Sequence, residues 1–160
     1  MALVAKDHPN RRVAIDDVDK AIIRELQLDG RAAYSKLGPA VGLSQAAVRQ
    51  RVQRLIEGGV VQVVAVTNPL MLGFDLQAMI GIQAEGDLRA IAVELGRVSE
   101  IDYVVITAGR YDLLVEVVCS GTDALLSLVN EVIRGIPGVR SAEAFTYLSL
   151  EKQTYSWGTR

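Results

Sequence analysis

The sequence predicts an α+β protein of two small domains, an N-terminal group of three helices and a C-terminal domain with the element order βαββαβ. Apolar residues recur at helical spacing between Asp16 and Glu57, whereas short β-branched runs prevail after Val60. Ten Lys and Arg stand against seven Asp and Glu in residues 1–68, but seven stand against twelve in residues 69–160. The basic first half suits a polyanionic partner, and the acidic second half has a different role.

The composition narrows the class of protein. Half of the 160 residues are hydrophobic, so the chain can bury a core, and no apolar stretch approaches the ~20 residues that span a bilayer. Residues 1–12 lack the apolar segment of a secretory signal, so we expect a cytoplasmic protein with no membrane partner. Cys119 lies in an apolar run and is expected to be a buried, inert thiol. His8 is the only histidine, so no metal site is predicted, and we also expect no cofactor.

A first helix is predicted after a mobile N-terminal arm of residues 1–14, which shows no periodic pattern. Its apolar residues recur every four positions, and Asp29-Gly30 ends it. Asp16, Asp17 and Asp19 open the helix. Three carboxylates could bind a metal ion, but without histidines or further spaced carboxylates nearby, capping and compensation of the helix dipole is the favoured interpretation.

Two further helices are predicted within residues 15–59. The second stops at Gly42, and we expect it to be short or distorted because Gly38-Pro39 removes a backbone hydrogen bond. Ser44 is a good N-cap for the third helix, which runs to Glu57 before two glycines. Three helices with a tight turn before the third form the layout of a helix-turn-helix domain, here of the winged-helix-like kind.

The third helix is the strongest candidate for a binding site. Its inward stripe is expected to be Val48, Val52 and Leu55, and a turn of about 100° per residue places Arg and Gln side chains on the opposite face. Arginine can bridge guanine and glutamine can bridge adenine in the major groove of double-stranded DNA, while flanking arginines and the first helical amides suit phosphates. A solvated basic face is the alternative, but the helix-turn-helix setting favours DNA. The predicted DNA-binding residues are Ser44, Gln45, Ala46, Arg49, Gln50, Arg51, Gln53 and Arg54.

The second half is expected to begin with a linker, residues 60–73, that contains a β-strand over residues 60–66. Residues 74–160 then follow the order of a ferredoxin-like sandwich, in which two helices cover one face of an antiparallel sheet. The run from Leu113 to Cys119 is apolar on both sides apart from Glu116, so we expect a second subunit to cover the other face. The expected strands are residues 76–84, 103–107, 113–119 and 139–150, and the expected helices are residues 88–98 and 123–134, the latter with Leu125, Leu128, Val129 and Val132 facing inward.

Motifs of one known family are spread over residues 15–152. They include Ile15-Asp16-Asp17-Val18-Asp19, Val41-Gly42-Leu43-Ser44, Gly59-Val60-Val61, Ala108-Gly109-Arg110-Tyr111-Asp112-Leu113-Leu114 and Ile136-Pro137-Gly138-Val139. Together they resemble the Lrp/AsnC family, the leucine-responsive and asparagine regulators, in both domains. Leu37-Gly38-Pro39 departs from that resemblance, because the family usually has a leucine-alanine pair and an ordinary helix former there. The departure affects the expected geometry of the second helix.

The resemblance implies a transcriptional regulator, with dimers gathered into octamers of four dimers and an amino-acid effector bound between subunits near residues 107–112. Residue chemistry supports this loop independently, because Gly109 permits close backbone approach, adjacent amides can hold a carboxylate and Asp112 can pair with an ammonium group. A tight β-turn with Tyr111 packed at an interface explains the same residues, and both interpretations stay open. The candidate effector-binding residues are Thr107, Ala108, Gly109, Arg110, Tyr111 and Asp112 of the loop, with Phe145 and Thr146 of the last strand.

Two other functions compete with this one. Ferredoxin-like folds host enzymes, but the chain has no Ser/His or Cys/His pair, no Gly-rich phosphate loop and no metal motif, so we expect it not to be an enzyme. A metabolite-binding module whose helix-turn-helix no longer recognises DNA is the second alternative. The favoured prediction is a sequence-specific DNA-binding transcriptional regulator, modulated by a small effector of the amino-acid class that the resemblance implies.

Overall fold

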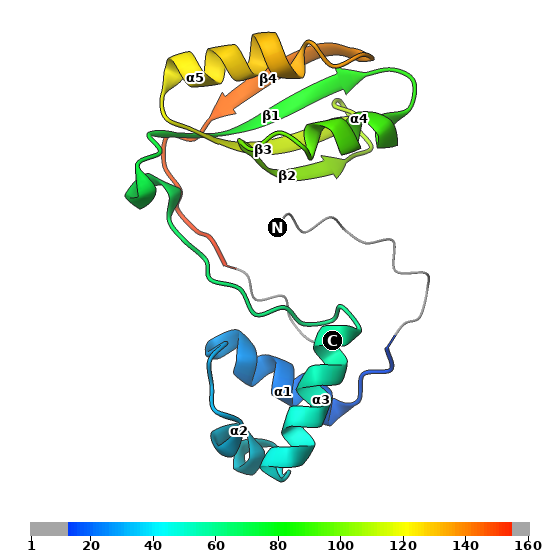
Figure 1. The fold of residues 1–160 in the computed structure, drawn as a ribbon, viewed down its shortest axis with the longest axis vertical. Helices are drawn as coiled ribbons and strands as arrows, with labels where there is room; N and C mark the ends of the chain where they lie inside the picture. The colour runs from blue at the N-terminus through cyan, green and yellow to red at the C-terminus, as the bar shows by residue number, and fades with distance from the viewer. Residues whose placement is uncertain (1–12, 155–160) are drawn as a thin grey trace. The chain divides into compact units, whose positions relative to one another are not determined.

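The computed structural model describes residues 13–154, which form two compact units (Figure 1). The first unit contains residues 13–66 together with residues 152–154, and the second contains Thr67–Glu151. The division after Val66 falls inside the segment 60–73 that the sequence assigns to a linker. The predicted arm, residues 1–14, lies outside the described residues except for Val13 and Ala14. Among the described residues, none of the helices is long and apolar enough to cross a membrane.

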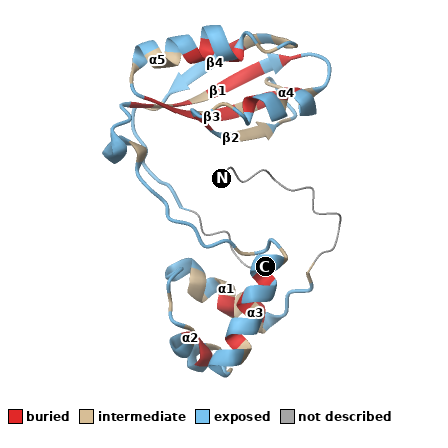
Figure 2. Ribbon diagram, in the orientation of Figure 1, coloured by how far each residue is buried: buried red, intermediate tan, exposed pale blue. Residues whose placement is uncertain are grey.

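The N-terminal unit contains the three predicted helices, α1 (Asp17–Leu28), α2 (Tyr34–Val41) and α3 (Gln45–Glu57). Asp16 caps α1 through a capping box with Asp19, and the Ser44 hydroxyl accepts a hydrogen bond from the Ala47 amide (3.2 Å) at the start of α3. Capping was therefore the correct interpretation of the acidic opening of α1. Figure 2 shows the buried residues on the inner sides of the helices. The core of the unit is Ile22, Leu37, Val48 and Val52, each at most 2 % exposed.

Helix α2 is short, as predicted, and Gly38 within it allows the following turn to pack closely against the helix. A Cβ atom on Gly38 would lie 2.6 Å from the carbonyl oxygen of Leu43. The Leu43 amide donates a hydrogen bond of 2.9 Å back to the Gly38 carbonyl, which holds the turn tightly against the helix. Gly42 ends α2 in the left-handed conformation with a φ of 70°. The glycine at position 38 thus lets the turn approach α2 closely enough to start α3 at Ser44.

The β-strand expected over residues 60–66 is absent, which corrects the sequence prediction. These residues follow α3 as irregular chain, and a short 3-10 helix, η1 (Pro69–Leu72), comes next. Val63, Val64 and Val66 are each more than half exposed. β-branched residues fit a pleated strand only when a neighbouring strand pairs with their backbone, and within residues 13–154 no strand pairs with this segment.

The C-terminal unit has the predicted βαββαβ order, and its antiparallel strands lie in the ferredoxin-like order β2-β3-β1-β4. Several elements end earlier than predicted. Strand β4 stops at Thr146, whose partner is Ala78 near the start of β1, so few residues of β1 remain to pair with a longer β4. The elements are β1 (Leu76–Ala84), α4 (Leu88–Leu95), β2 (Ile101–Ile106), β3 (Leu113–Cys119), α5 (Thr122–Ser127), η2 (Leu128–Ile133) and β4 (Val139–Thr146).

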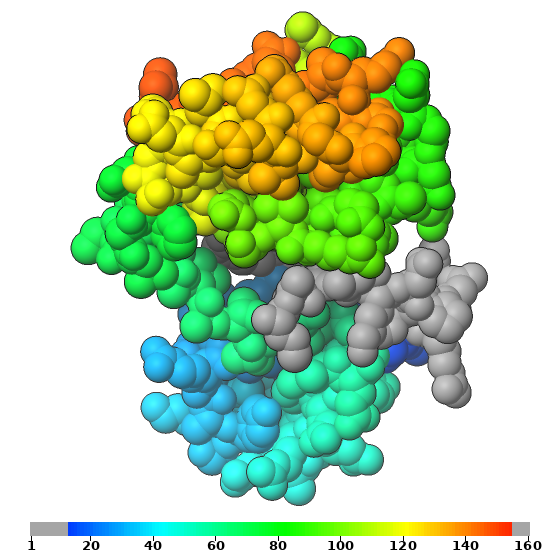
Figure 3. Space-filling view, turned by 45° about the horizontal axis from the view of Figure 1, so that its top comes forward, coloured from blue at the N-terminus to red at the C-terminus, as the bar shows by residue number. Residues whose placement is uncertain are grey.

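One face of the sheet is covered by α4 and by the continuous helical segment of α5 and η2. In the space-filling view, the yellow and orange atoms of α5 and η2 form one layer with the green atoms of α4 (Figure 3). The expected inward residue Val132 is 40 % exposed, and Ile133 is fully buried in its place. The reason is that η2 is a π-helix, whose wider turn shifts the inward position by one residue. Cys119 is buried, as predicted.

The opposite face of the sheet, here called the open face, is covered by no described helix of this unit, although Val118 on it is buried. It carries apolar side chains that alternate with the core residues along the strands. Glu116 interrupts them and accepts hydrogen bonds from Gln77 Nε2 (2.9 Å) and from the Tyr147 hydroxyl (3.0 Å). Burial and this hydrogen bond raise the pKa of Tyr147 to about 12. The apolar members of the open face are Met79, Tyr103, Val105, Leu114, Val118 and Phe145.

The core assignment predicts a large difference between two leucines of this unit. Leu113 is fully buried, whereas Leu126 on α5 is 60 % exposed. We expect Leu113→Ala to lower the free energy of unfolding by about 2 to 5 kcal/mol, because it removes buried apolar contacts and leaves a cavity. Leu126→Ala should change the same free energy by less than about 0.5 kcal/mol. Urea unfolding at one protein concentration measures both, and equal losses would contradict the assignment.

Candidate nucleic-acid interface and effector loop

Helix α3 presents the predicted DNA-binding residues on one side. Val48, Val52 and Leu55 are at most 1 % exposed, so the opposite side of the helix faces outward. A shallow surface pocket runs along that side, here called the recognition face. It is lined by Ser44, Gln45, Ala46, Arg49, Gln50, Gln53, Arg54 and Glu57. The structure thus brings seven of the eight predicted residues together, and Arg51 is the one outside.

Glu57 is a member of this face that the sequence prediction missed. Its carboxylate accepts a hydrogen bond of 3.0 Å from Gln53 Nε2, one turn earlier on the helix. The four-residue spacing of the two residues could have revealed the contact. The pairing engages the Gln53 amide with Glu57, and Arg49 and Gln50 are exposed on the same face. Arg49 and Gln50 therefore have the chemistry and the exposure that contact with base edges requires.

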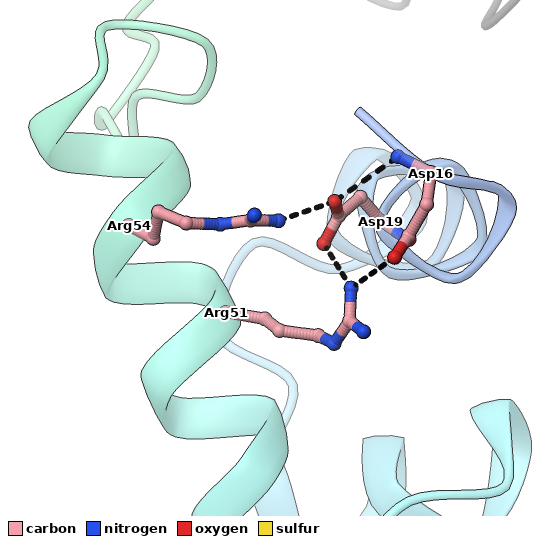
Figure 4. A network of polar contacts seen from close by, with 4 residues as sticks. All are labelled: Asp16, Asp19, Arg51 and Arg54. Carbon is pink, nitrogen blue, oxygen red and sulfur yellow. Dashed lines mark hydrogen bonds and ion pairs between the residues drawn. The ribbon is translucent and has the colours of Figure 1, made fainter. Parts of the chain in front are cut away.

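Arg51 and Arg54 point toward the start of α1, where they meet a buried carboxylate (Figure 4). Asp19 is fully buried, and one of its oxygens accepts a hydrogen bond of 2.9 Å from Arg51 Nη1. Its other oxygen accepts from Arg54 Nη2 and from the Asp16 amide (3.2 Å). Every oxygen of this buried charge is thus paired, as a carboxylate in a protein interior requires.

Asp16 completes the network from the surface. Its carboxylate accepts the Asp19 amide at 2.7 Å and Arg51 Nη1 at 2.7 Å. The hydrogen bond from the Asp19 amide, and next the hydrogen bond from Arg51, lower the pKa of Asp16. The carboxylates of Asp16 and Asp19 in turn raise the pKa of Arg51. The sequence pattern predicts only capping for these aspartates. It carries no signal for the buried ion pairs, which join residues 32 and 35 positions apart.

The candidate effector loop, residues 107–112, is a closed turn between β2 and β3. The Thr107 amide donates to the Asp112 carbonyl (2.9 Å), and the Thr107 hydroxyl donates to the Tyr111 carbonyl (2.6 Å). The Asp112 carboxylate accepts the Ala84 amide at 2.8 Å, where the register of β1 and β4 shifts. Asp112 therefore ties the loop to the end of β1. Ala108 and Gly109 are exposed, with open space beside Gly109.

Tyr111 packs onto the open face of the sheet. A Cβ atom on Gly81 would lie 2.7 Å from the tyrosine ring, so only a glycine leaves room for the ring in this position. The Tyr111 hydroxyl donates to Glu143, which raises the pKa of Tyr111, and the ring of Phe145 meets it edge-on with centroids 6.0 Å apart. Arg110 lies over the same ring, 5.4 Å from its centroid, and 3.7 Å from the Glu143 carboxylate.

The two candidate residues of the last strand, Phe145 and Thr146, lie on opposite sides of the sheet. Phe145 contacts Tyr111 and so lies beside the loop. Thr146 pairs with the core residue Ala78, so its side chain lies on the other side of the sheet from Phe145. One chain alone therefore brings seven of the eight candidate effector residues together. No group of acidic, histidine or cysteine side chains in residues 13–154 is arranged to hold a metal ion.

Comparison with known families matches both halves of the chain. Residues 15–56 match the AsnC-type helix-turn-helix domain, and residues 74–160 match a C-terminal dimeric alpha+beta barrel domain of AsnC-type regulators. The second match alone spans more than half of the chain. It describes a domain that self-associates, in agreement with the need to cover the open face.

Individual relatives agree with these matches over most of their length. An uncharacterised HTH-type transcriptional regulator of Pyrococcus abyssi is 34 % identical over 92 % of this chain and 94 % of its own. The regulatory protein AsnC of Escherichia coli is 27 % identical, over 84 % of this chain and 90 % of its own. The feast or famine regulatory protein of Mycobacterium tuberculosis, solved in complex with L-methionine, has a TM-score of 0.83 and 30 % identity, covering 91 % of this chain and all of that one.

These relatives are transcriptional regulators, which agrees with the prediction that the chain is not an enzyme. The three-helix unit with an exposed recognition face, the sheet with one open face and the matches to both domains converge on one conclusion: the chain belongs to the Lrp/AsnC family of transcriptional regulators.

Proposed function

We propose that this regulator binds specific DNA sequences through the recognition face of α3, and that residues 15–59 form its DNA-binding domain. The observation that carries the proposal is the exposure of Arg49 and Gln50 on the side of α3 opposite its buried stripe. Their side chains can make paired hydrogen bonds to guanine and adenine in the major groove, and the capped start of α3 offers amides to a phosphate. A regulator of chromosomal genes works beside the chromosome, so we also propose a cytoplasmic location.

We further propose that residues 74–160 assemble the subunits and bind an amino-acid effector at the loop 107–112. The L-methionine bound to the Mycobacterium tuberculosis relative supports an amino acid as the effector. The exposed amides of Ala108 and Gly109 suit a carboxylate, and Arg110 and Asp112 bring opposite charges to the loop. Residues 60–73 link this domain to the DNA-binding domain.

Assembly into dimers through the open face, and of four dimers into an octamer, is the third part of the proposal. The open face supports the dimer because its apolar side chains, such as Leu114 and Phe145, need a cover. The alternative interpretation of the loop, a turn packed at an interface, agrees with Tyr111 lying on the same face as these side chains. The two roles are compatible, because a ligand that binds the assembled and the separate subunits with different affinities shifts the assembly, and a site at the interface can make that difference.

DNA recognition by α3 predicts a loss of sequence discrimination in two variants. A duplex selected by the wild-type protein from a random library provides the probe. Arg49→Ala and Gln50→Ala should each reduce the preference for that duplex over a scrambled one by about 1 to 3 kcal/mol, the value of a paired base contact. Arg97→Ala, the same kind of change in the other unit, is the control and should leave the preference unchanged. Unaltered preference in both α3 variants, measured by fluorescence anisotropy, would overturn the assignment.

Assembly through the open face predicts opposite results for two leucine variants. Leu114→Glu places a charge among the apolar side chains of the open face, and burying it in an interface costs several kcal/mol, about 2 to 5 by the range for unpaired buried charges. Leu126→Glu makes the same change on α5, away from that face. In analytical ultracentrifugation the first variant should sediment as smaller species than wild type, and the second as wild type. Wild-type sedimentation of Leu114→Glu would show that the sheet is covered otherwise.

The effector proposal predicts that Asp112→Asn weakens amino-acid binding. L-methionine is the first probe, followed by the other common amino acids in a thermal-shift screen. Loss of a charge-assisted hydrogen bond to the ammonium group should cost about 1.5 to 3 kcal/mol of affinity. Asp123→Asn, the same change in the first turn of α5, is the control. Calorimetry decides between the outcomes: equal dissociation constants place the effector elsewhere, and loss of assembly in Asp112→Asn alone favours the structural role of the loop.

A further inference from the structure

We propose that Asp19 is a positioning residue for DNA binding, which acts by orienting the guanidinium group of Arg54 toward phosphate. This inference rests on the proposed use of the recognition face. Its basis is a juxtaposition across two helices: a fully buried carboxylate on α1 lies in direct contact with an arginine that also lines the recognition face of α3 (Figure 4).

The burial of Asp19 makes it an unusual charge. It is the one buried charged or polar side chain among residues 13–154, in a core otherwise made of apolar groups. A buried carboxylate persists only when its hydrogen bonds are satisfied, and here α3 supplies two of them through Arg51 and Arg54. The cost of removing either partner keeps both arginines on Asp19.

The two arginines differ in what else they reach. Arg51 is 29 % exposed, is held by two carboxylates and lies outside the recognition face, so we assign it to holding α1 against α3. Arg54 is 47 % exposed, is bonded to Asp19 and lines the recognition face. Of the four residues drawn in Figure 4, Arg54 alone connects the buried charge with the surface proposed to meet DNA.

The planarity of arginine turns this contact into an orientation. A guanidinium group carries five N–H donors in one rigid plane, so binding one Nη to Asp19 sets the direction of the others. A side chain oriented before binding loses less conformational freedom when it meets a phosphate than a free one does. Asp19 thereby acts on DNA binding through Arg54, without contacting the DNA itself.

Net charge and positioning predict opposite results for Asp19→Asn. Removing a negative charge from the DNA-binding unit should tighten binding if only charge matters, because the polyanion is attracted more strongly. If Asp19 orients Arg54, the same change should weaken binding. Asp17→Asn is the matched control, since Asp17 lies on the same helix, carries the same charge and has a side chain that is 98 % exposed.

The experiment measures binding of the full-length variants to the duplex selected by wild type, by fluorescence anisotropy over a range of salt concentrations. We expect Asp19→Asn to bind roughly threefold to tenfold more weakly than Asp17→Asn, with a slope of log affinity against log salt that is lower by about 0.9 for each phosphate that the variant no longer binds. A merely destabilising change would leave this slope unaltered in the folded protein. Circular dichroism melting fixes a temperature at which both variants are folded.

A double variant tests whether the effect passes through Arg54. In an Arg54→Gln background, Asp19→Asn should cause no further decrease of affinity and no further change of slope. If Asp19→Asn does not fold, nuclear magnetic resonance relaxation of the Arg54 side-chain nitrogen in the wild-type protein decides instead. We expect this guanidinium group to be ordered in the protein without DNA. A disordered Arg54, or an Asp19→Asn variant that binds as tightly as Asp17→Asn with the same slope, overturns the proposal. Failure of the wild-type protein to select any duplex would instead remove the proposed function itself.

Discussion

The C-terminal unit is governed by the need to keep both faces of one apolar sheet from water. The helices α4, α5 and η2 cover one face with a continuous core, and the described part of the unit leaves the other face open. An apolar face of this kind is unfavourable in water, and association with another subunit removes it. The matching domain family is dimeric, which agrees with this constraint.

The open face also determines where a signal could enter the assembly. Tyr111 reaches it from the loop 107–112 and occupies the space that Gly81 leaves, while Arg110 and Glu143 lie beside the ring. A ligand at the loop would therefore bear on the residues that line the open face, and any change in Tyr111 would change the surface presented to a partner. Asp112 anchors the loop to β1 and limits how far it can move. In the proposed function, sensing and assembly therefore share the side chains of this loop.

In the N-terminal unit, electrostatics and packing act on the same helix. The apolar stripe of α3 fixes which side of the helix faces outward, and the ion pairs with Asp19 fix how two of its arginines lie. The buried carboxylate gives α1 a part in arranging the recognition face, although α1 contributes no residue to it. Under the proposed role of Asp19, a change in α1 alters DNA binding without removing a DNA contact.

The sequence by itself determined the three helices, their caps, the inward stripe of α3 and the ferredoxin-like order, because each depends on local periodicity and on residues close together in the chain. Asp16, Ser44 and Gly42 act where their residue types predicted, at helix ends. What only the tertiary structure decided depends on residues far apart or on pairing partners. The segment 60–66 has the composition of a strand, but no strand of the described chain pairs with it, and the wider turn of the π-helix η2 places Ile133 in the core instead of Val132. The contacts of Asp19 with Arg51 and Arg54, and of Tyr111 with Gly81, arise from helix and strand packing across about 30 positions, over which local sequence patterns carry no information.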